Sequence, residues 1–247
     1  MRLYKTETLV LRSVKYREAD SLLTLLTKEK GKVKAIAKGV RKINSRLRGG
    51  VQLFTHNQML LYHGRNLHTV TQSECLEAFA PLQKNMATLT AACYWCELLD
   101  TFLPWEEKES DLFALALAGF HLIALENSSL VIRGLEIKLL AALGYQPILN
   151  HCVVCGQALK EGQMIFFSPA GGGTLCAHCQ TEVGLSLTWE VLKTWQLFQE
   201  MPFSKFMRLK ISQGGLEILN RLLEKYLEYQ LDYPLKSRTI LEKMWLG

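Results

Sequence analysis

The sequence predicts an α+β multidomain protein with an N-terminal β-barrel, a larger helical domain and a cysteine-rich insert within the helical domain. Residues 1–80 carry short segments rich in leucine and β-branched residues, without a helical period. From residue 81 onward, alanine and leucine recur at helical spacing, and residues 148–183 interrupt this pattern with two C-x2-C motifs. The predicted domains are therefore 1–80 and 81–247, with the insert at 148–183.

Five short strands are expected in the first domain, at residues 7–14, 20–27, 32–38, 51–62 and 67–71. Polar and glycine-containing turns separate them, at 28–31 and 63–66 among other places. Five strands in so short a segment are typical of a small closed barrel. An oligonucleotide-binding (OB) barrel is the first interpretation and an SH3-like barrel the second.

Helices are expected at residues 82–103, 111–125, 128–143, 188–200 and 215–231. Gly144 stands where the residue after a helix C-terminus belongs, and Pro147 follows as a stop signal. The boundary between the domains is expected near residues 77–81.

Composition limits the class of protein. With 49% hydrophobic residues, a chain of 247 residues can bury sizeable cores. Residues 1–20 lack the apolar core of a secretory signal, and the longest nearly uncharged run, 112–125, is too short to span a bilayer. Seven cysteines without a signal favour a reducing cytoplasm and no membrane partner.

Positive charge is concentrated at one end. Residues 1–50 hold 14 Lys and Arg against 4 Asp and Glu, a net charge of +10, whereas the remainder has a net charge of −4. So dense a group of cations is typical of a surface that meets a polyanion, and a nucleic-acid backbone is the commonest one. A solvated lysine face that only promotes solubility is the alternative.

The candidate nucleic-acid contacts lie on the third expected strand, in the loop after it and near the end of the first strand. They are Lys15, Arg17, Lys32, Lys34, Lys38, Arg41, Lys42, Arg46 and Arg48. The lysines of segment 32–38 alternate with Val33, Ala35 and Ala37, which predicts one cationic strand face. Tyr16 is a candidate ring for base stacking, while Phe54 and Tyr62 are equally good barrel-core residues. Because no pattern suggests reading of base edges, binding is expected to ignore sequence.

Four cysteines predict a zinc site. Cys152 with Cys155, and Cys176 with Cys179, form two C-x2-C turns separated by twenty residues, a spacing typical of tetrahedral zinc. Gly156 suits the left-handed position that often follows such a turn. Disulfides or free thiols are the alternatives, as is a swap of His178 for Cys179. Four thiolates close the coordination shell, so the expected zinc ion is structural rather than catalytic.

Catalytic motifs are missing from the sequence. Cys93 and Cys96 form another C-x2-C pair, but they lie inside the expected helix 82–103, where cysteines three residues apart are usually core rather than redox-active. The chain has no phosphate-binding G-x-x-x-x-G-K-[ST] loop, G-x-S-x-G or H-E-x-x-H motif. We therefore expect a protein that is not an enzyme.

Motifs along the whole chain resemble those of the bacterial recombination mediator family RecO. Three groups carry the resemblance: E-A-D-x-L-L-x-L-L-T at 18–27 with Gly31-Lys32, the segments 37–42, 45–47 and 51–54; R-x-x-E-x-x-L-L-x-x-L-G-Y-x-P at 133–147; and Y-P-L-K-S-R at 233–238. Because zinc is not universal in that family, the four cysteines place this sequence in its zinc-bearing group.

The resemblance implies an OB domain, a helical domain and a zinc element. It implies binding of single- and double-stranded DNA, annealing of complementary strands, and help to RecA on DNA coated by single-strand-binding protein, near the nucleoid. The implied partners are RecR and the acidic C-terminal tail of single-strand-binding protein. Arg133 matches a family motif and, with Lys138, is a candidate contact for an acidic peptide; the alternative for Arg133 is a surface arginine on an amphipathic helix.

Two other functions stay open. A zinc enzyme acting on nucleic acid would need an open metal site and a carboxylate base, and the sequence suggests neither. An RNA- or ribosome-binding adaptor is compatible with the composition, because OB barrels and zinc ribbons both serve there.

Overall fold

The computed structural model describes residues 2–126, 128–180 and 184–246. Their contacts divide the chain into two compact units. The first unit contains residues 2–126 together with 236–246, and the second contains the described residues from 128 to 235. The second unit is thus inserted, in sequence, between two parts of the first.

The N-terminal part of the first unit is a closed five-stranded barrel. Its strands are β1 (Leu3–Tyr16), β2 (Asp20–Thr27), β3 (Gly31–Ala37), β4 (His56–Tyr62) and β5 (His68–Glu77). They follow the order β1-β2-β3-β5-β4, and β4 pairs with β1 to close the barrel. The β3–β5 pairing is parallel and the other pairings are antiparallel. This topology confirms the OB-type barrel.

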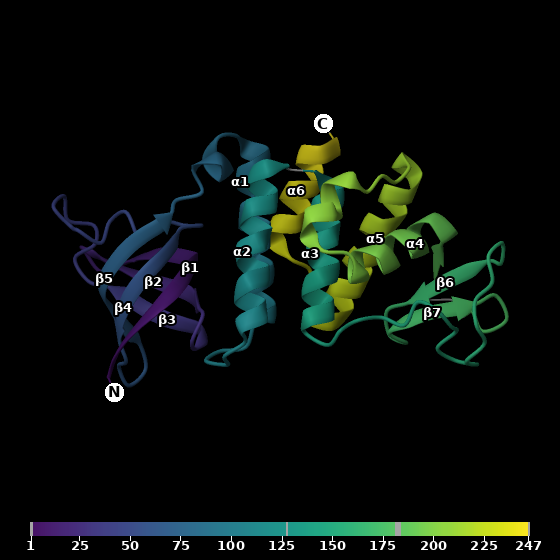
Figure 1. Ribbon diagram of the computed structural model, residues 1–247, viewed down its shortest axis with the longest axis horizontal. Helices are drawn as coiled ribbons and strands as arrows, with labels where there is room; N and C mark the ends of the chain where they lie inside the picture. Colours follow the sequence, from purple (N-terminus) through teal and green to yellow (C-terminus); the bar gives the residue numbers. More distant parts are fainter. Residues whose placement is uncertain (1, 127, 181–183, 247) are drawn as a thin grey trace. The chain divides into compact units, whose positions relative to one another are not determined.

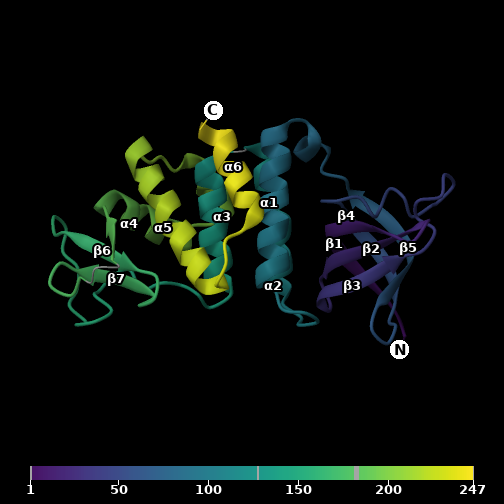
Figure 2. The ribbon, with the colours of Figure 1, turned by 180° about the vertical axis from the view of Figure 1, so that it is seen from behind.

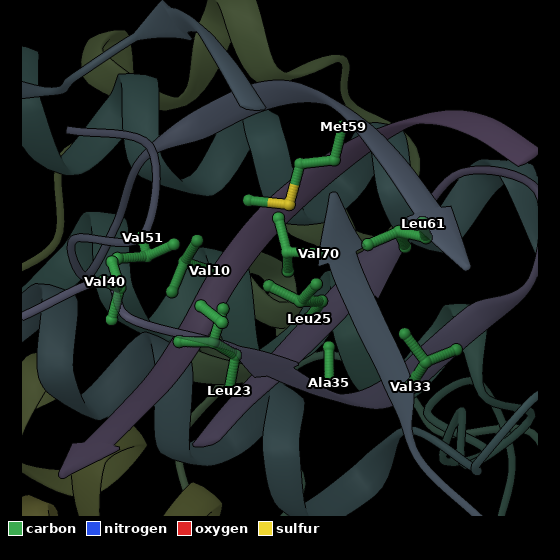
Figure 3. Packing of buried hydrophobic residues seen from close by; sticks show 11 residues of the cluster. Val10, Leu23, Leu25, Val33, Ala35, Val40, Val51, Met59, Leu61 and Val70 are labelled. Atoms are coloured by element: carbon green, nitrogen blue, oxygen red, sulfur yellow. The ribbon is translucent and has the colours of Figure 1, made fainter. Parts of the chain in front are cut away.

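Alternation along the strands fills the barrel with aliphatic side chains. Alternate residues of β2 and β3, among them Leu23, Leu25 and Val33, point into one buried cluster. Figure 3 shows Val40 and Val51, from the loop between β3 and β4, beside Val10 at one end of this cluster. The loop therefore closes that end of the barrel with two valines.

The expected strand at 51–62 is too long. The structure has turns at residues 51–54, and β4 begins only at His56. Val51 and Phe54 are apolar because they are buried, but they belong to the loop. Their apolar character therefore gave the same sequence pattern as a buried strand. The strands β1 and β5 are longer than expected. In β5, mostly exposed polar residues continue the strand beyond the apolar segment that the sequence indicates.

Helices complete the first unit. They are the 3-10 turn η1 (Ala80–Gln83), α1 (Met86–Phe102), α2 (Ser110–Leu125) and α6 (Lys236–Leu246). Asn85 caps α1, its side chain accepting a hydrogen bond from the Thr88 backbone N–H at 2.9 Å. In Figures 1 and 2, α1 and α2 lie alongside the barrel, and Phe120 of α2 packs against Phe54, with the ring centroids 6.1 Å apart.

Helix α6 was not expected, because its sequence is polar and weakly periodic. It packs against α1. The carboxylate of Glu97 accepts hydrogen bonds from the backbone N–H groups of Lys236 and Ser237, at 3.2 and 2.8 Å. This carboxylate satisfies donors that a helix N-terminus otherwise leaves unpaired.

The second unit combines three long helices with a small sheet. The helices are α3 (Ser129–Ala142), α4 (Trp189–Glu200) and α5 (Gln213–Leu231), with the 3-10 turn η2 (Phe203–Arg208). The strands are β6 (Ile165–Ser168), β7 (Gly173–Cys176) and β8 (Leu185–Leu187), in the order β7-β6-β8. Ser128, Thr188 and Ser212 cap the three helices, and Gly144 takes the expected left-handed conformation after α3.

The small sheet rests on the helices of its unit through aromatic packing. Phe167 of β6 contacts Trp195 of α4 and Tyr226 of α5, with centroids 5.2 and 5.3 Å apart. Figure 2 shows β6 and β7 beside these two helices. The four-cysteine segment is therefore attached to the helices on one side of its sheet.

Candidate metal centre and nucleic-acid interface

The four predicted cysteine ligands come from two turns that backbone hydrogen bonds hold together. Cys152 and Cys155 lie in the turn before β6, and Cys176 ends β7 just before the turn that carries Cys179. The N–H of Val153 donates to the carbonyl of Thr174, and the N–H of Thr174 donates to the carbonyl of Ile148, both at 2.9 Å. The first turn is thereby fixed beside β7.

The geometry suits one tetrahedral metal ion. All four Sγ atoms lie within 4.8 Å of one another, and those of Cys155 and Cys176 are 3.9 Å apart. Zinc–thiolate bonds of about 2.3 Å in a tetrahedron require sulfur–sulfur separations of roughly 3.8 Å. Gly156 has the expected positive φ of 71°, and its N–H donates to the carbonyl of Cys152 at 2.9 Å. His178 is not part of this cluster.

The local backbone also favours the thiolate form of a ligand. Burial by itself raises the pKa of Cys152, but backbone N–H groups of Val154, Cys155 and Cys176 hydrogen-bond its sulfur and lower the pKa to about 6. Metal-binding cysteines must be deprotonated, so these donors prepare the site for a cation. The four cysteines therefore fit a metal ion by donor set and by spacing, and the backbone donors favour the thiolate form at Cys152.

The pair in α1 has the opposite character. Burial raises the pKa of the Cys93 and Cys96 thiols, and neighbouring carboxylates act in the same direction. A redox-active cysteine needs a lowered pKa and access to solvent, whereas Cys96 is fully buried. These two cysteines are packing residues, as expected from their place in a helix.

The basic residues of the barrel do not form the single strand face that alternation predicts. Lys34 and Lys38 are exposed, but the side chain of Lys32 is only 3% exposed. Its ammonium group donates to the backbone carbonyl of Asp100, lies 3.5 Å from the Asp100 carboxylate and sits 4.3 Å from the ring centre of Trp105. Lys32 as a surface contact is therefore wrong: α1 and the loop after it cover it.

Lys34 lines a groove on the outer face of the barrel. The groove has a volume of about 540 Å³, and β1, β2, β3 and the β4–β5 loop contribute to it. Arg12 and Tyr16 also line it, and Arg17 lies over the Tyr16 ring at 5.2 Å. Lys34 further stacks on Trp105, which is partly exposed. Two cations at or beside the groove, Lys34 and Arg17, thus each lie over an aromatic ring.

Sequence reasoning missed two residues near this groove, Arg12 and Trp105. Arg12, Val14 and Tyr16 follow one another at every second position of β1, so the period of two could have grouped Arg12 with the stacking candidate Tyr16. Trp105 carries no local signal, because its position beside Lys34 depends on a loop between two helices.

The other predicted cations lie on a second surface. Lys15, Arg41 and Arg48 line a separate hollow at the end of the barrel, and Arg17, Lys38, Lys42 and Arg46 are exposed around the same end of β1–β3 and in the β3–β4 loop. The structure therefore divides the cationic set between the outer groove, the hollow and the connecting loop.

Arg133 is not a surface arginine. Its side chain is fully buried in α3, where Nη1 lies 2.9 Å from Oε1 of Glu136, whose side chain is equally buried. It therefore cannot meet an acidic peptide at the surface. Lys138 is half-buried, and its ammonium donates to the backbone carbonyl of Gln199 at 2.8 Å.

None of the helices, over the residues that the structure describes, combines the length and apolar character needed to cross a membrane.

Comparisons with known proteins agree along the chain. Residues 1–79 match the family described as "Recombination protein O N terminal", and residues 83–239 match "Recombination protein O C terminal". The relatives named DNA repair protein RecO include those of three bacteria. The protein of Desulforamulus reducens is 38% identical over 99% of this chain and 96% of its own length. That of Heliobacterium modesticaldum is 39% identical over 99% and 91%, and that of Moorella thermoacetica 34% identical over 98% and 91%.

Proposed function

This chain belongs to the recombination protein O family and has the DNA repair and recombination role of that family; on this premise we propose that it binds DNA without sequence preference and anneals complementary strands. The observation that carries the proposal is the barrel end, where exposed cations border a groove and a hollow on an OB-type scaffold. Strands and loops at this part of an OB barrel are the usual oligonucleotide-binding face.

Annealing requires no catalytic residue. Cations that neutralise phosphates on two strands reduce the repulsion between them and raise their local concentration. The protein is in this proposal a mediator and not an enzyme. It acts in the cytoplasm, at the nucleoid, on single- and double-stranded DNA.

The proposed partners follow from the family. RecR forms a complex with the protein, the C-terminal tail of single-strand-binding protein recruits it, and RecA then replaces single-strand-binding protein on the DNA. Residues 1–80 supply the DNA contacts in this division of labour, and the helical domain 81–247 supplies protein contacts. With Arg133 buried, the surface for the acidic tail has to use other residues than that arginine.

The proposed cofactor is one structural zinc ion, held by Cys152, Cys155, Cys176 and Cys179 in the insert 148–183. Zinc supplies folding free energy to a segment whose glycine-rich centre offers little apolar surface. With four thiolate ligands it has no open position for a substrate.

The decisive experiment removes cations outside the hollow and compares salt dependence. If about four phosphates of a single strand are neutralised, the log–log salt slope is near −2.8, and its magnitude falls by roughly 0.7 for each phosphate that is no longer neutralised. We expect Lys34/Lys38/Arg46→Ala to slow annealing without ATP and to bring the slope to about −0.7.

A matched control removes the same charge elsewhere. Lys193, Lys205 and Lys210 are exposed in the second unit, and their joint change to Ala should leave the slope and the annealing rate unaltered. An equal decrease of the salt slope and the annealing rate in both triple variants would show that only the net charge of the protein matters. Unchanged annealing in the first variant would remove the proposed surface, and a strong preference for RNA over DNA of equal length would favour an RNA adaptor.

A further inference from the structure

The hollow at the end of the barrel has features that binding of the sugar–phosphate chain alone does not require. Its volume is about 710 Å³, within the range of small-molecule sites. Three cations line it, Lys15, Arg41 and Arg48, and none of the described residues that line it carries a carboxylate. An uncompensated group of cations in a concave site favours an anion.

The β1–β2 pairing places one wall. Lys15 pairs directly with Ser21, so these side chains share a face of the ladder, and Ser13 lies on that face two residues earlier. Residues of the outer groove, such as Arg12 and Tyr16, alternate with them along β1. The hollow and the outer groove therefore use opposite faces of the same hairpin.

Hydrogen bonds hold Arg41 at this wall. Its backbone N–H donates to the carbonyl of Ala19 at 2.9 Å, and its Nη1 donates to the carbonyl of Glu18 at 3.0 Å. Both acceptors belong to the β1–β2 turn. The guanidinium is thus positioned before any ligand arrives, although the side chain remains exposed.

The floor of the hollow contains a strained residue. Phe54 has a φ of 68°, an uncommon conformation for a bulky side chain. Two main-chain hydrogen bonds to β1 hold it there: Phe54 N–H to the carbonyl of Val10 at 3.0 Å, and Val10 N–H to the carbonyl of Thr55 at 3.1 Å. Strained residues of this kind cluster at ligand sites.

Apolar and amide groups complete the lining. Leu53 and Phe54 come from the β3–β4 loop, and Leu89 comes from α1. Gln52 and Gln83 each present an amide, which can donate and accept hydrogen bonds. The Gln52 amide nitrogen already donates one of its two hydrogens to the carbonyl of Arg48 at 2.8 Å, which leaves the second hydrogen as a donor and the oxygen as an acceptor.

We propose that this hollow binds one nucleotide of an unpaired DNA strand, with the phosphate against the three cations and the base between the apolar wall and the two amides. The proposal rests on the proposed DNA binding and adds a site for a base to it. A base in a duplex is stacked and its Watson–Crick edge is occupied, so only an unpaired nucleotide can enter. Amides that both donate and accept accommodate any base, in keeping with binding that ignores sequence.

The test uses the full-length protein and three small probes: thymidine 5′-monophosphate, 2-deoxyribose 5-phosphate and inorganic phosphate. Titration calorimetry or NMR shift perturbation gives their affinities. Because base stacking on protein surfaces contributes substantially to affinity, the nucleotide should bind about tenfold more tightly than the abasic sugar phosphate. Equal affinity for the three probes would reduce the hollow to a general anion site and overturn the proposal.

Two variants with the same added charge test whether the nucleotide binds in the hollow. Leu89→Glu puts a carboxylate into the hollow, and Met86→Glu puts the same charge on an exposed position of α1 that does not line it. Leu89→Glu should weaken nucleotide binding by about tenfold or more, and Met86→Glu should leave it unchanged. Equal affinities of the two variants would place the binding elsewhere.

A third variant covers the case in which Leu89→Glu does not fold. Gln83 is exposed, so Gln83→Ala keeps the packing, and it should weaken nucleotide binding while leaving phosphate binding as it is. Unchanged binding of both probes would also overturn the proposal. Annealing by Lys34/Lys38/Arg46→Ala tests the underlying DNA binding with residues outside the hollow, so the two failures are distinguishable.

Discussion

The barrel and the four-cysteine segment are both small β-structures, but they are stabilised in different ways. The barrel closes on itself and encloses a cluster of aliphatic side chains, including two valines from a loop. The four-cysteine segment has a three-stranded sheet, and its described residues pack on helices through Phe167. Its four cysteine sulfur atoms lie together beside the sheet. The first is stabilised by apolar burial, whereas the second combines apolar packing on its helices with a cluster of four thiols that could hold a metal ion.

The two units also differ in whether their charged side chains are exposed or buried. Most candidate cations of the barrel are exposed, while Arg133 of α3 is buried beside Glu136. An exposed cation contributes little to stability and remains available to a ligand, but a buried ion pair is costly to break. The comparison separates residues that are available for binding from residues that support the fold.

Removing the metal should give the largest difference between the two regions. Structural zinc contributes about 10–16 kcal/mol of binding free energy in zinc-finger peptides, so chelation should unfold residues 148–180 and leave the barrel folded. Hydrogen exchange followed by mass spectrometry measures both regions in one sample. Cys155→Ser should give the same result and release the metal, while Cys75→Ser, at an exposed cysteine outside the cluster, serves as control. An equal decrease of protection in β1–β5 would contradict this difference.

Breaking the buried ion pair should have the next largest effect. Arg133→Met leaves the Glu136 carboxylate without its partner guanidinium inside α3, at a cost of about 3–5 kcal/mol in the free energy of unfolding. Arg133→Met/Glu136→Leu removes both charges and should recover most of this stability. Urea denaturation measures all three proteins. A single variant as stable as the parent would show that Arg133 does not act as a structural residue.

Two lysines of β3 allow a finer comparison, because they differ in burial but not in chemistry. Lys32→Met removes a buried hydrogen bond from a charged donor and should cost about 1–3 kcal/mol, without changing the salt slope of DNA binding. Lys34→Met should change stability by less than about 0.5 kcal/mol and reduce the slope by roughly 0.7. Denaturation of both variants measures the change in stability, and salt titrations of DNA binding measure the change in slope. The reverse outcome would place Lys32 at the DNA surface.

Much of the fold was predictable because its signals are local. Residues 20–27 and 188–200 were expected within a residue of β2 and α4, and the conformations of Gly144 and Gly156 follow from their places after a helix and a cysteine turn. The four cysteines were found from spacing alone. The polar helix α6 had no comparable signal, since its packing against α1 determines it.

The errors share one physical cause. Lys32 is buried by Asp100 and Trp105, which lie about 70 residues further along the chain, and Arg133 is buried by packing around α3. A pattern within one strand or helix shows which residues share a face, but only the tertiary contacts show whether that face is covered. For the same reason the hollow lined by Lys15, Leu53 and Leu89 could not be read from spacing.

The capping of α6 by Glu97 has a consequence for biosynthesis. The ribosome completes the second unit before it makes residues 236–246, which the first unit needs to cover α1. Nascent chains normally fold one unit after another. Here the barrel and the inserted unit can both reach their native form while α1 still awaits a neighbour that is translated more than a hundred residues later. A chain stalled before that point would expose the uncovered side of α1 to chaperones.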